Sequence, residues 1–209
     1  HANSLVFDPE RRAIIVSVRH TNQLIALDFT DDLGPQTGVR WILGAAGTVP
    51  YEGESFHHTH GAMVDTDGSI VLYDNGNFRP GTVLAGGDAA PYSRAVRIEV
   101  DDESNNPAEW TARQVWDHVL EDPKTGTPAF APFVSDADAL PNGNVLVTHG
   151  GLGGLASFQH VHILEYATEG ERNGDIVWEL QLGEPGDEIT VYRADRWESL
   201  YFGPLWESP

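Results

Sequence analysis

One pattern of short apolar segments occurs three times along the 209-residue chain. Each copy has a first strand, a polar turn (DPERR, DTDG or LPNG), an apolar second strand, a third strand, and a last strand that contains a tryptophan (RWIL, QVWD or IVWE). Such self-similarity is typical of repeat architectures in which each unit is a small antiparallel sheet. The sequence therefore predicts an all-β fold, a β-propeller with four-stranded antiparallel blades.

The repeats predict one partial propeller domain over residues 1–209, with blades at about 1–45, 57–119 and 132–183 and an incomplete fourth at 189–209. Closed propellers typically have about 4–8 blades. A chain of about three and a half blades that has no Met at position 1 is expected to be a piece of a longer protein. The strands predicted in the first three blades are 4–8, 13–19, 23–29, 38–44, 61–65, 69–74, 93–101, 111–118, 134–140, 144–149, 160–167 and 175–182.

The tryptophan of each last strand is interpreted as packing between blades. Large aromatic side chains dominate core energetics, so Trp41, Trp116 and Trp178 are expected in the core rather than at a ligand. Residues 77–91 form a long insertion in the second blade. Insertions of that kind are loops, and loops often carry function.

The charge balance is strongly acidic. Lys and Arg number 12 against 32 Asp and Glu, a net charge of −20, and Lys124 is the only lysine. This balance argues against nucleic acid and anionic membranes as partners. We interpret it as the surface of a halophilic protein; an ordinary acidic secreted protein is the alternative. The sequence contains no Cys, which excludes disulfides and thiolate chemistry.

No stretch approaches the roughly 18 consecutive apolar residues of a membrane helix. The first residues also lack the charged and apolar regions of a signal peptide, so a targeting segment is expected upstream. The sequence thus predicts no membrane insertion for this segment. An incomplete propeller would leave a strand edge unpaired, which favours association and makes a homo-oligomer one expectation.

The chain has nine His, and the densest group is Phe56-His57-His58-Thr59-His60. His60 stands just before a predicted first strand, and His1 holds the matching position one blade earlier. The first strand of a propeller blade is the innermost one. The two side chains are therefore expected to face the central channel from neighbouring blades.

The motifs resemble those of the bacterial arylsulfate sulfotransferase family. The similarity runs in order over almost the whole chain, through HANSLVFDPERRAIIVSVRHTNQLIALD, WILG, HHTHGA, LYDNGNFRP, PYSRAV, QVW, IVWE and YRA. Its most informative elements are the HxNS start, the SxRH strand end and the distant His-x-Ala. The DNG within it means little alone, since Asn-Gly is a common hairpin turn.

The resemblance implies a six-bladed propeller that transfers a sulfuryl group from an aryl sulfate to another phenol. The family does so through a sulfohistidine, without a nucleotide or other cofactor, and its members are exported to the periplasm or outside the cell. A further histidine of the family lies upstream and has no counterpart in this sequence.

The resemblance also implies roles for individual residues. The transient nucleophile corresponds to His60, and the sulfuryl-binding groups correspond to His1, Asn3 and Arg19. Arg79, Arg94 and Arg193 are further candidates for substrate contact. The alternative for Arg79 and Arg94 is insertion between blades, paired with carboxylates, whereas Arg193 begins the next blade.

The residue types also suit the chemistry. Sulfuryl transfer, like phosphoryl transfer, is expected to pass through a loose transition state with charge on its peripheral oxygens, so cationic and neutral donors are needed. Arg19 offers a planar fork of donors, Asn3 an amide and His1 a ring nitrogen. A neutral imidazole at His60 is a competent nucleophile.

Two other functions stay open. His58 and His60, like His160 and His162, are two residues apart and would share a strand face, which is compatible with a metal site. No third ligand is evident in the sequence, and no metal is expected. The other alternative is a non-catalytic propeller that binds a ligand or partner across its face.

Overall fold

The structure, a computed structural model, describes residues 1–29, 38–121, 127–153, 160–184 and 187–197. Its strands form three sheets, which confirms the all-β prediction. No helix in these parts of the chain is long and apolar enough to cross a membrane. The helical segments are short 3-10 turns: η1 (Arg19–Thr21), η2 (Val83–Ala85), η3 (Pro107–Glu109) and η4 (Gly170–Arg172).

The first sheet has four antiparallel strands in chain order, β1-β2-β3-β4. Apolar β-branched residues alternate in depth along β2, as expected for a strand with a core on one side. The strands are close to those predicted, except that β1 begins two residues earlier. They are β1 (Ala2–Asp8), β2 (Ala13–Val18), β3 (Gln23–Asp28) and β4 (Val39–Gly44).

The second sheet has five strands in the order β5-β9-β8-β7-β6. Four of them match the predicted second blade. The fifth, β5, was not predicted; its two residues pair parallel to the outer strand β9. The strands are β5 (Tyr51–Glu52), β6 (His60–Val64), β7 (Ile70–Asp74), β8 (Arg94–Asp101) and β9 (Thr111–Val119).

The third sheet repeats the arrangement of the first, with the order β10-β11-β12-β13. Its first strand is shorter than the predicted 134–140, because Val134 and Ser135 adopt positive φ values of 50° and 80° before the strand begins. The strands are β10 (Asp136–Ala139), β11 (Val145–Leu152), β12 (His160–Tyr166) and β13 (Ile176–Leu182).

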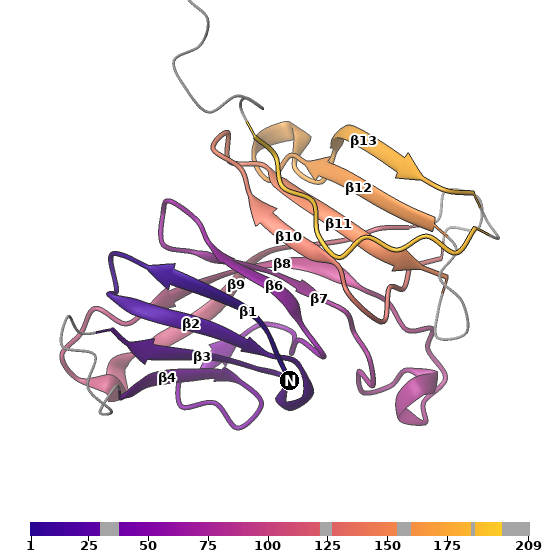
Figure 1. The fold of residues 1–209 in the computed structure, drawn as a ribbon. Coiled ribbons are helices and arrows are strands. Elements are labelled where there is room, and N and C mark those ends of the chain that lie inside the picture. Colours follow the sequence, from indigo (N-terminus) through magenta and orange to yellow (C-terminus); the bar gives the residue numbers. More distant parts are fainter. Residues whose placement is uncertain (30–37, 122–126, 154–159, 185–186, 198–209) are drawn as a thin grey trace, which may run out of the picture.

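The second sheet is covered on both faces by its neighbours (Figure 1). Along β7, Ile70 and Leu72 pack into the core shared with the first sheet, while Val71 and Tyr73 pack into the core shared with the third. All four side chains are fully buried. The unbroken apolar run of this strand therefore follows from its central position in the stack.

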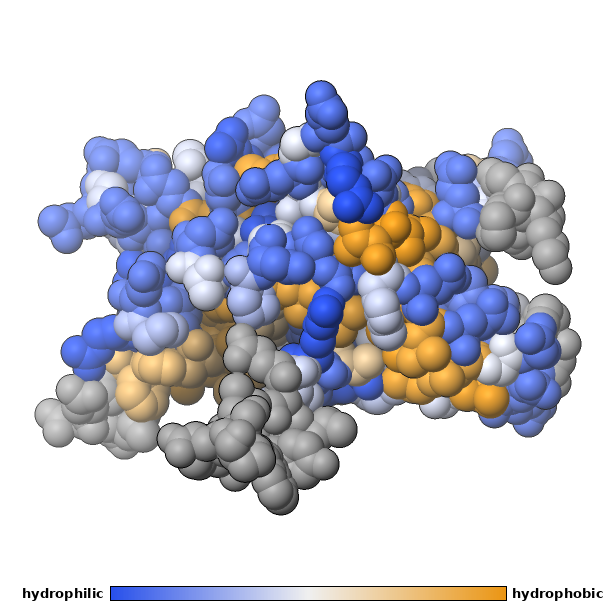
Figure 2. Space-filling view, turned by 90° about the horizontal axis from the view of Figure 1, so that it is seen from above, coloured by the Kyte–Doolittle hydropathy of each residue, from blue (hydrophilic) through white to orange (hydrophobic). Residues whose placement is uncertain are grey.

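Two of the three repeated tryptophans pack between sheets. Trp41 on β4 is fully buried in the first core and Trp116 on β9 is 8% exposed in the second, which confirms the expected packing. Trp178 on β13 is 45% exposed, because the described residues place no further sheet over it. In the view from above, hydrophobic patches lie among hydrophilic residues (Figure 2).

The first strands of the three sheets lie side by side: β6 contacts both β1 and β10. This is the arrangement of propeller blades around an axis, with their first strands innermost. Within the described residues the sheets form an arc rather than a closed ring (Figure 1). The prediction of a propeller fragment is confirmed at this level.

The predicted fourth blade falls mostly outside the described residues, which end at residue 197. The part that is described, 187–197, contains no strand and runs along the third sheet. The Val191 amide donates a hydrogen bond to the Gly150 carbonyl at 2.9 Å, which ties this segment to β11.

Candidate active site

His60 is the first residue of β6, on the innermost strand of the central sheet, and is 3% exposed. The following residue, Gly61, has a φ of 56°, and a Cβ there would collide with the carboxylate of Asp136 on β10. Glycine is therefore required at position 61. It allows the irregular register between His60 and Met63 on β6 and lets the third sheet approach closely.

The side chain of His60 is held by Asn75, which follows directly after β7. His60 Nδ1 lies 2.6 Å from Asn75 Oδ1. Asn75 is fully buried, and its Nδ2 donates to the carbonyls of Ala131 at 2.7 Å and Val134 at 3.1 Å. One amide thus connects His60 to the chain that leads into β10.

The environment favours a neutral His60 imidazole. Burial lowers the pKa of His60 to about 4; the hydrogen bond that the ring makes to Asn75 Oδ1 opposes this shift, and the positive charge of Arg19 adds to it. At neutral pH the ring therefore carries one proton and keeps a lone pair on the other nitrogen. Such a ring can act as a nucleophile.

Asn3 on β1, and His1 directly before it, lie near His60. The rings of His1 and His60 lie 6.3 Å apart between centroids. Asn3 Nδ2 donates to the carbonyl of Thr59 at 2.6 Å, so one of its two amide hydrogens positions the residue before His60. Thr59 is also bonded through its hydroxyl to Ser17 on β2, at 3.1 Å.

Arg19 follows directly after β2 and is buried, with 6% exposure. Its backbone amide donates to the His1 carbonyl at 3.0 Å, and one guanidinium nitrogen donates to the Pro132 carbonyl at 2.9 Å. Burial lowers the pKa of Arg19. Among the described residues no carboxylate lies within ion-pair distance of its guanidinium. In a chain of net charge −20 this cation remains available to an anion.

Arg79 and Arg94 lie in a different environment, a buried ion-pair cluster around Asp74. Arg79 pairs with Asp74 at 2.6 Å, and Arg94 pairs with the same carboxylate at 3.0 Å. Both also pair with Glu54. Asp74 further accepts a hydrogen bond from the His57 amide at 2.8 Å. The geometry supports the structural role for both arginines, and substrate contact stays a prediction.

The segment 187–197 contributes two groups near His60. The ring of Tyr192 stands edge-on to His60 at a centroid distance of 5.9 Å. Arg193 is 47% exposed on its side chain, and its Nε lies 3.9 Å from Asp136 Oδ2. Arg193 thus reaches the inner side of the sheets, and its contact with substrate stays a prediction. Tyr192 was missed by the sequence analysis as a separate candidate.

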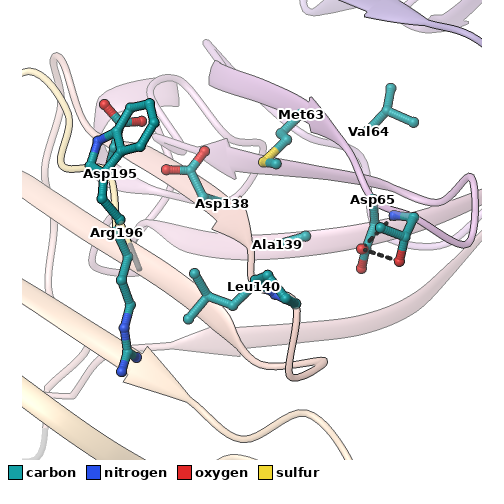
Figure 3. A pocket seen from close by; sticks show the side chains of 11 residues that line it. Met63, Val64, Asp65, Asp138, Ala139, Leu140, Asp195 and Arg196 are labelled. Carbon is teal, nitrogen blue, oxygen red and sulfur yellow. Dashed lines mark hydrogen bonds between the residues drawn. The ribbon is translucent and has the colours of Figure 1, made fainter. Parts of the chain in front are cut away.

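A pocket between the ends of β6 and β10 differs in charge from the His60 environment (Figure 3). Asp65, Asp138 and Asp195 line it. Burial, together with the neighbouring charges of Asp136 and Asp195, raises the pKa of Asp138. The arginine of this pocket, Arg196, pairs with Glu165. An anionic sulfate ester is therefore expected near Arg19 and not in this pocket.

The histidine pairs do not assemble a metal site within the described residues, where no group of three or more His, Asp or Glu side chains is arranged to hold an ion. His58 has a φ of 56° and precedes β6, so it does not share a strand face with His60 as supposed. His160 and His162 do lie together on β12, with ring centroids 5.1 Å apart.

The structure thus brings His1, Arg19 and His60 together and connects Asn3 to them through Thr59. Asn75 was missed, because DNG was interpreted as a hairpin turn. The sequence feature that could have indicated Asn75 is its position directly after an apolar strand.

The stacked four-stranded sheets, with a buried His and Arg at their inner edges, define a β-propeller fragment with a candidate anion site. A family model described as arylsulfotransferase (ASST) matches residues 1–193, so the chain belongs to the arylsulfotransferase family. No curated protein matches the chain. Membership of this family supports an enzyme of the sulfotransferase type that acts on aryl sulfates and phenols.

Proposed function

We propose that the protein transfers a sulfuryl group from a phenolic sulfate ester to a phenolic acceptor through a sulfohistidine on His60. One observation carries the proposal: a buried, neutral imidazole lies close to a buried arginine that has no carboxylate partner among the described residues. The first group can attack sulfur, and the second can bind the sulfuryl oxygens.

In the first half-reaction the lone pair of His60 attacks sulfur. The S–O bond to the donor phenol breaks, and its electron pair leaves on the phenolate oxygen, which takes a proton from water. Phenols ionise near pH 10, so they leave far more readily than alkanols. This difference favours aryl sulfates as donors.

In the second half-reaction the oxygen of the acceptor phenol attacks sulfur. The N–S bond breaks, its electron pair returns to His60, and the phenolic proton passes to water. In both steps charge gathers on the sulfuryl oxygens, where Arg19 supplies two-pronged donors and His1 a ring nitrogen. The second amide hydrogen of Asn3 is a further donor, since the first is bonded to Thr59.

The ring of Tyr192 suits the aromatic part of the substrate. It lies edge-on to His60 at 5.9 Å and is partly exposed. Aromatic pairs favour edge-on or offset contacts, so a phenyl group bound beside His60 would find a partner there. Export of the protein is proposed on family membership alone.

Initial-rate kinetics of the intact protein test the proposal. With a chromogenic aryl sulfate and a phenolic acceptor, double-reciprocal plots should give parallel lines, because the donor phenol leaves before the acceptor reacts. Turnover should need no added nucleotide. Intersecting lines, or sulfate transfer that requires both substrates to be bound together, would contradict the covalent route.

A further inference from the structure

We propose that Asn75 is a positioning residue that fixes the tautomer of His60, so that Nε2 is the atom that attacks sulfur. The proposal rests on the proposed function for its chemical consequence, but the tautomer itself follows from hydrogen bonds alone. Neither the family match nor the motifs of the sequence assign a role to Asn75.

The orientation of the Asn75 amide is fixed by its two carbonyl partners. Ala131 O and Val134 O can only accept hydrogen bonds, and they lie 2.7 and 3.1 Å from the same amide nitrogen. That atom must therefore be the donor Nδ2. A flipped amide would direct its oxygen at two carbonyl oxygens in a buried site, which would cost two hydrogen bonds.

The fixed amide then decides the proton on His60. Asn75 Oδ1 can only accept, and it lies 2.6 Å from His60 Nδ1, so Nδ1 must carry the hydrogen. A neutral imidazole has one N–H. Nε2 consequently keeps its lone pair and is the nitrogen available to sulfur.

The backbone on both sides of Asn75 is held firmly. Ser93 Oγ donates to the Asn75 carbonyl at 2.8 Å, and Asp74 Oδ1 accepts from the Gly76 amide at 3.1 Å. A Cβ at position 76 would collide with the Tyr92 carbonyl, and the φ of Gly76 is 75°. The Asp74 carboxylate is in turn fixed by the ion pairs of Arg79 and Arg94, so the buried cluster supports the position of Asn75.

An asparagine suits this position better than an aspartate for nucleophilic chemistry. A carboxylate in place of Oδ1 would stabilise the imidazolium and raise the pKa of His60, which would protonate the attacking nitrogen. The neutral amide accepts the Nδ1 hydrogen without adding charge. The other groups that face His60 are Arg19, His58, His1 and Tyr192. The charge of Arg19 favours the neutral ring, whereas His58 acts both ways, since its backbone hydrogen bond raises the pKa of His60 and its charge lowers it.

NMR of the intact protein with ¹⁵N-labelled histidine tests the tautomer directly. The His60 signals are assigned by their loss in His60→Asn. We expect Nδ1 to show the shift of a protonated nitrogen and Nε2 that of an unprotonated one at pH 7. In Asn75→Ala the two forms should mix, and kcat should fall about 10- to 100-fold with KM for the donor little changed.

Two further variants sharpen the test. Asn75→Asp should shift the acid limb of the kcat/KM profile to higher pH, because the carboxylate raises the pKa of His60. Asn106→Ala, the same truncation at an exposed cap on η3, should leave kcat and the His60 signals unchanged. If the Asn75 variants fail to fold, the wild-type spectrum alone still shows which nitrogen of His60 carries the proton.

A wild-type His60 protonated on Nε2 overturns the proposal, and so does an Asn75→Ala enzyme with unchanged kcat and unchanged spectrum. Failure of the proposed function has a different signature: the wild-type protein would then form no sulfuryl adduct on His60, whatever its tautomer.

Discussion

Burial lowers the pKa of both Arg19 and His60, but the chemical results are opposite. Arg19 begins far above neutral pH and stays charged, whereas His60 falls to about 4 and becomes neutral. A cation and a neutral nucleophile therefore lie side by side without a carboxylate between them among the described residues. The separate cluster of Arg79, Arg94 and Asp74 shows that this chain neutralises its other buried arginines where no anion site is needed.

Replacing Arg19 by lysine should remove most of the activity with little change in fold. A point charge cannot reproduce a two-pronged contact with sulfuryl oxygens. Loss of one preorganised donor commonly costs about 2.7–4 kcal/mol in the transition state, or about 10²- to 10³-fold in kcat. The matched control is Arg113→Lys, at an exposed ion pair with Glu99, which should leave kcat unchanged. Near-normal turnover of Arg19→Lys would make Arg19 a structural residue.

The depressed pKa of His60 predicts how activity depends on pH. The unprotonated ring is the reactive form, so kcat/KM should hold as the pH falls through 6.5 and should drop only as it approaches about 4. An ordinary histidine would lose activity near pH 6.5. Circular dichroism at each pH separates protonation from acid unfolding. An acid limb centred near 6.5 would contradict the environment described for His60.

At the scale of elements, the strands of the first three blades could be predicted because each alternates or runs apolar between turn residues that stop it. The pair Tyr51–Glu52 in β5 is too short to show any period, and its pairing with β9 is a tertiary contact. β10 begins late because Val134 and Ser135 adopt positive φ values, which residue preferences disfavour.

The site could be predicted only where a residue stands in a motif. His1, Asn3, Arg19 and His60 became candidates in this way. Asn75 was missed because its partners Ala131 and Val134 are more than fifty residues away and act through backbone carbonyls, which carry no sequence signal. Tyr192 was missed as a neighbour of His60 for the same reason: the segment 187–197 returns to the inner side of the sheets only in the folded chain.

Gly61 on β6 lies in close contact with Asp136 on β10, so its replacement by alanine should destabilise the protein. The φ of 56° alone costs a residue with a side chain about 1–2 kcal/mol. The collision with Asp136 should add to that cost and displace the inner strand of the third sheet. Gly81→Ala, with a φ of 87° and open space around it, carries only the backbone cost. Equal unfolding free energies for the two variants in urea titrations would show that the Gly61 contact is not tight.

At the scale of the molecule, three sheets stack with their first strands innermost, and both ends of the stack expose apolar side chains. Trp178 is 45% exposed at one end, and Leu5 and Phe7 are 69% and 49% exposed at the other. The corresponding Trp41 and Trp116 are covered by a following sheet. We therefore expect further sheets of the intact protein to cover both ends, as in other propellers.

The charge of the molecule predicts that molar salt stabilises it. The 32 carboxylates repel one another, whereas most of the exposed ion pairs are each worth only about 0–1 kcal/mol. The screening length falls to about 3 Å at 1 M salt, which relieves the repulsion. The melting temperature of the intact protein should rise between dilute buffer and molar potassium chloride. A flat or falling curve would reject the halophilic interpretation.

The most direct measurement is the identity of the residue that carries the sulfuryl group. The intact protein is mixed with an aryl sulfate and no acceptor, quenched within milliseconds, digested and analysed by mass spectrometry. The account predicts an acid-labile sulfuryl group on His60, lost together with phenol release in His60→Asn and retained in His57→Asn. The absence of an adduct in the wild-type protein, or an adduct on His1, would contradict it.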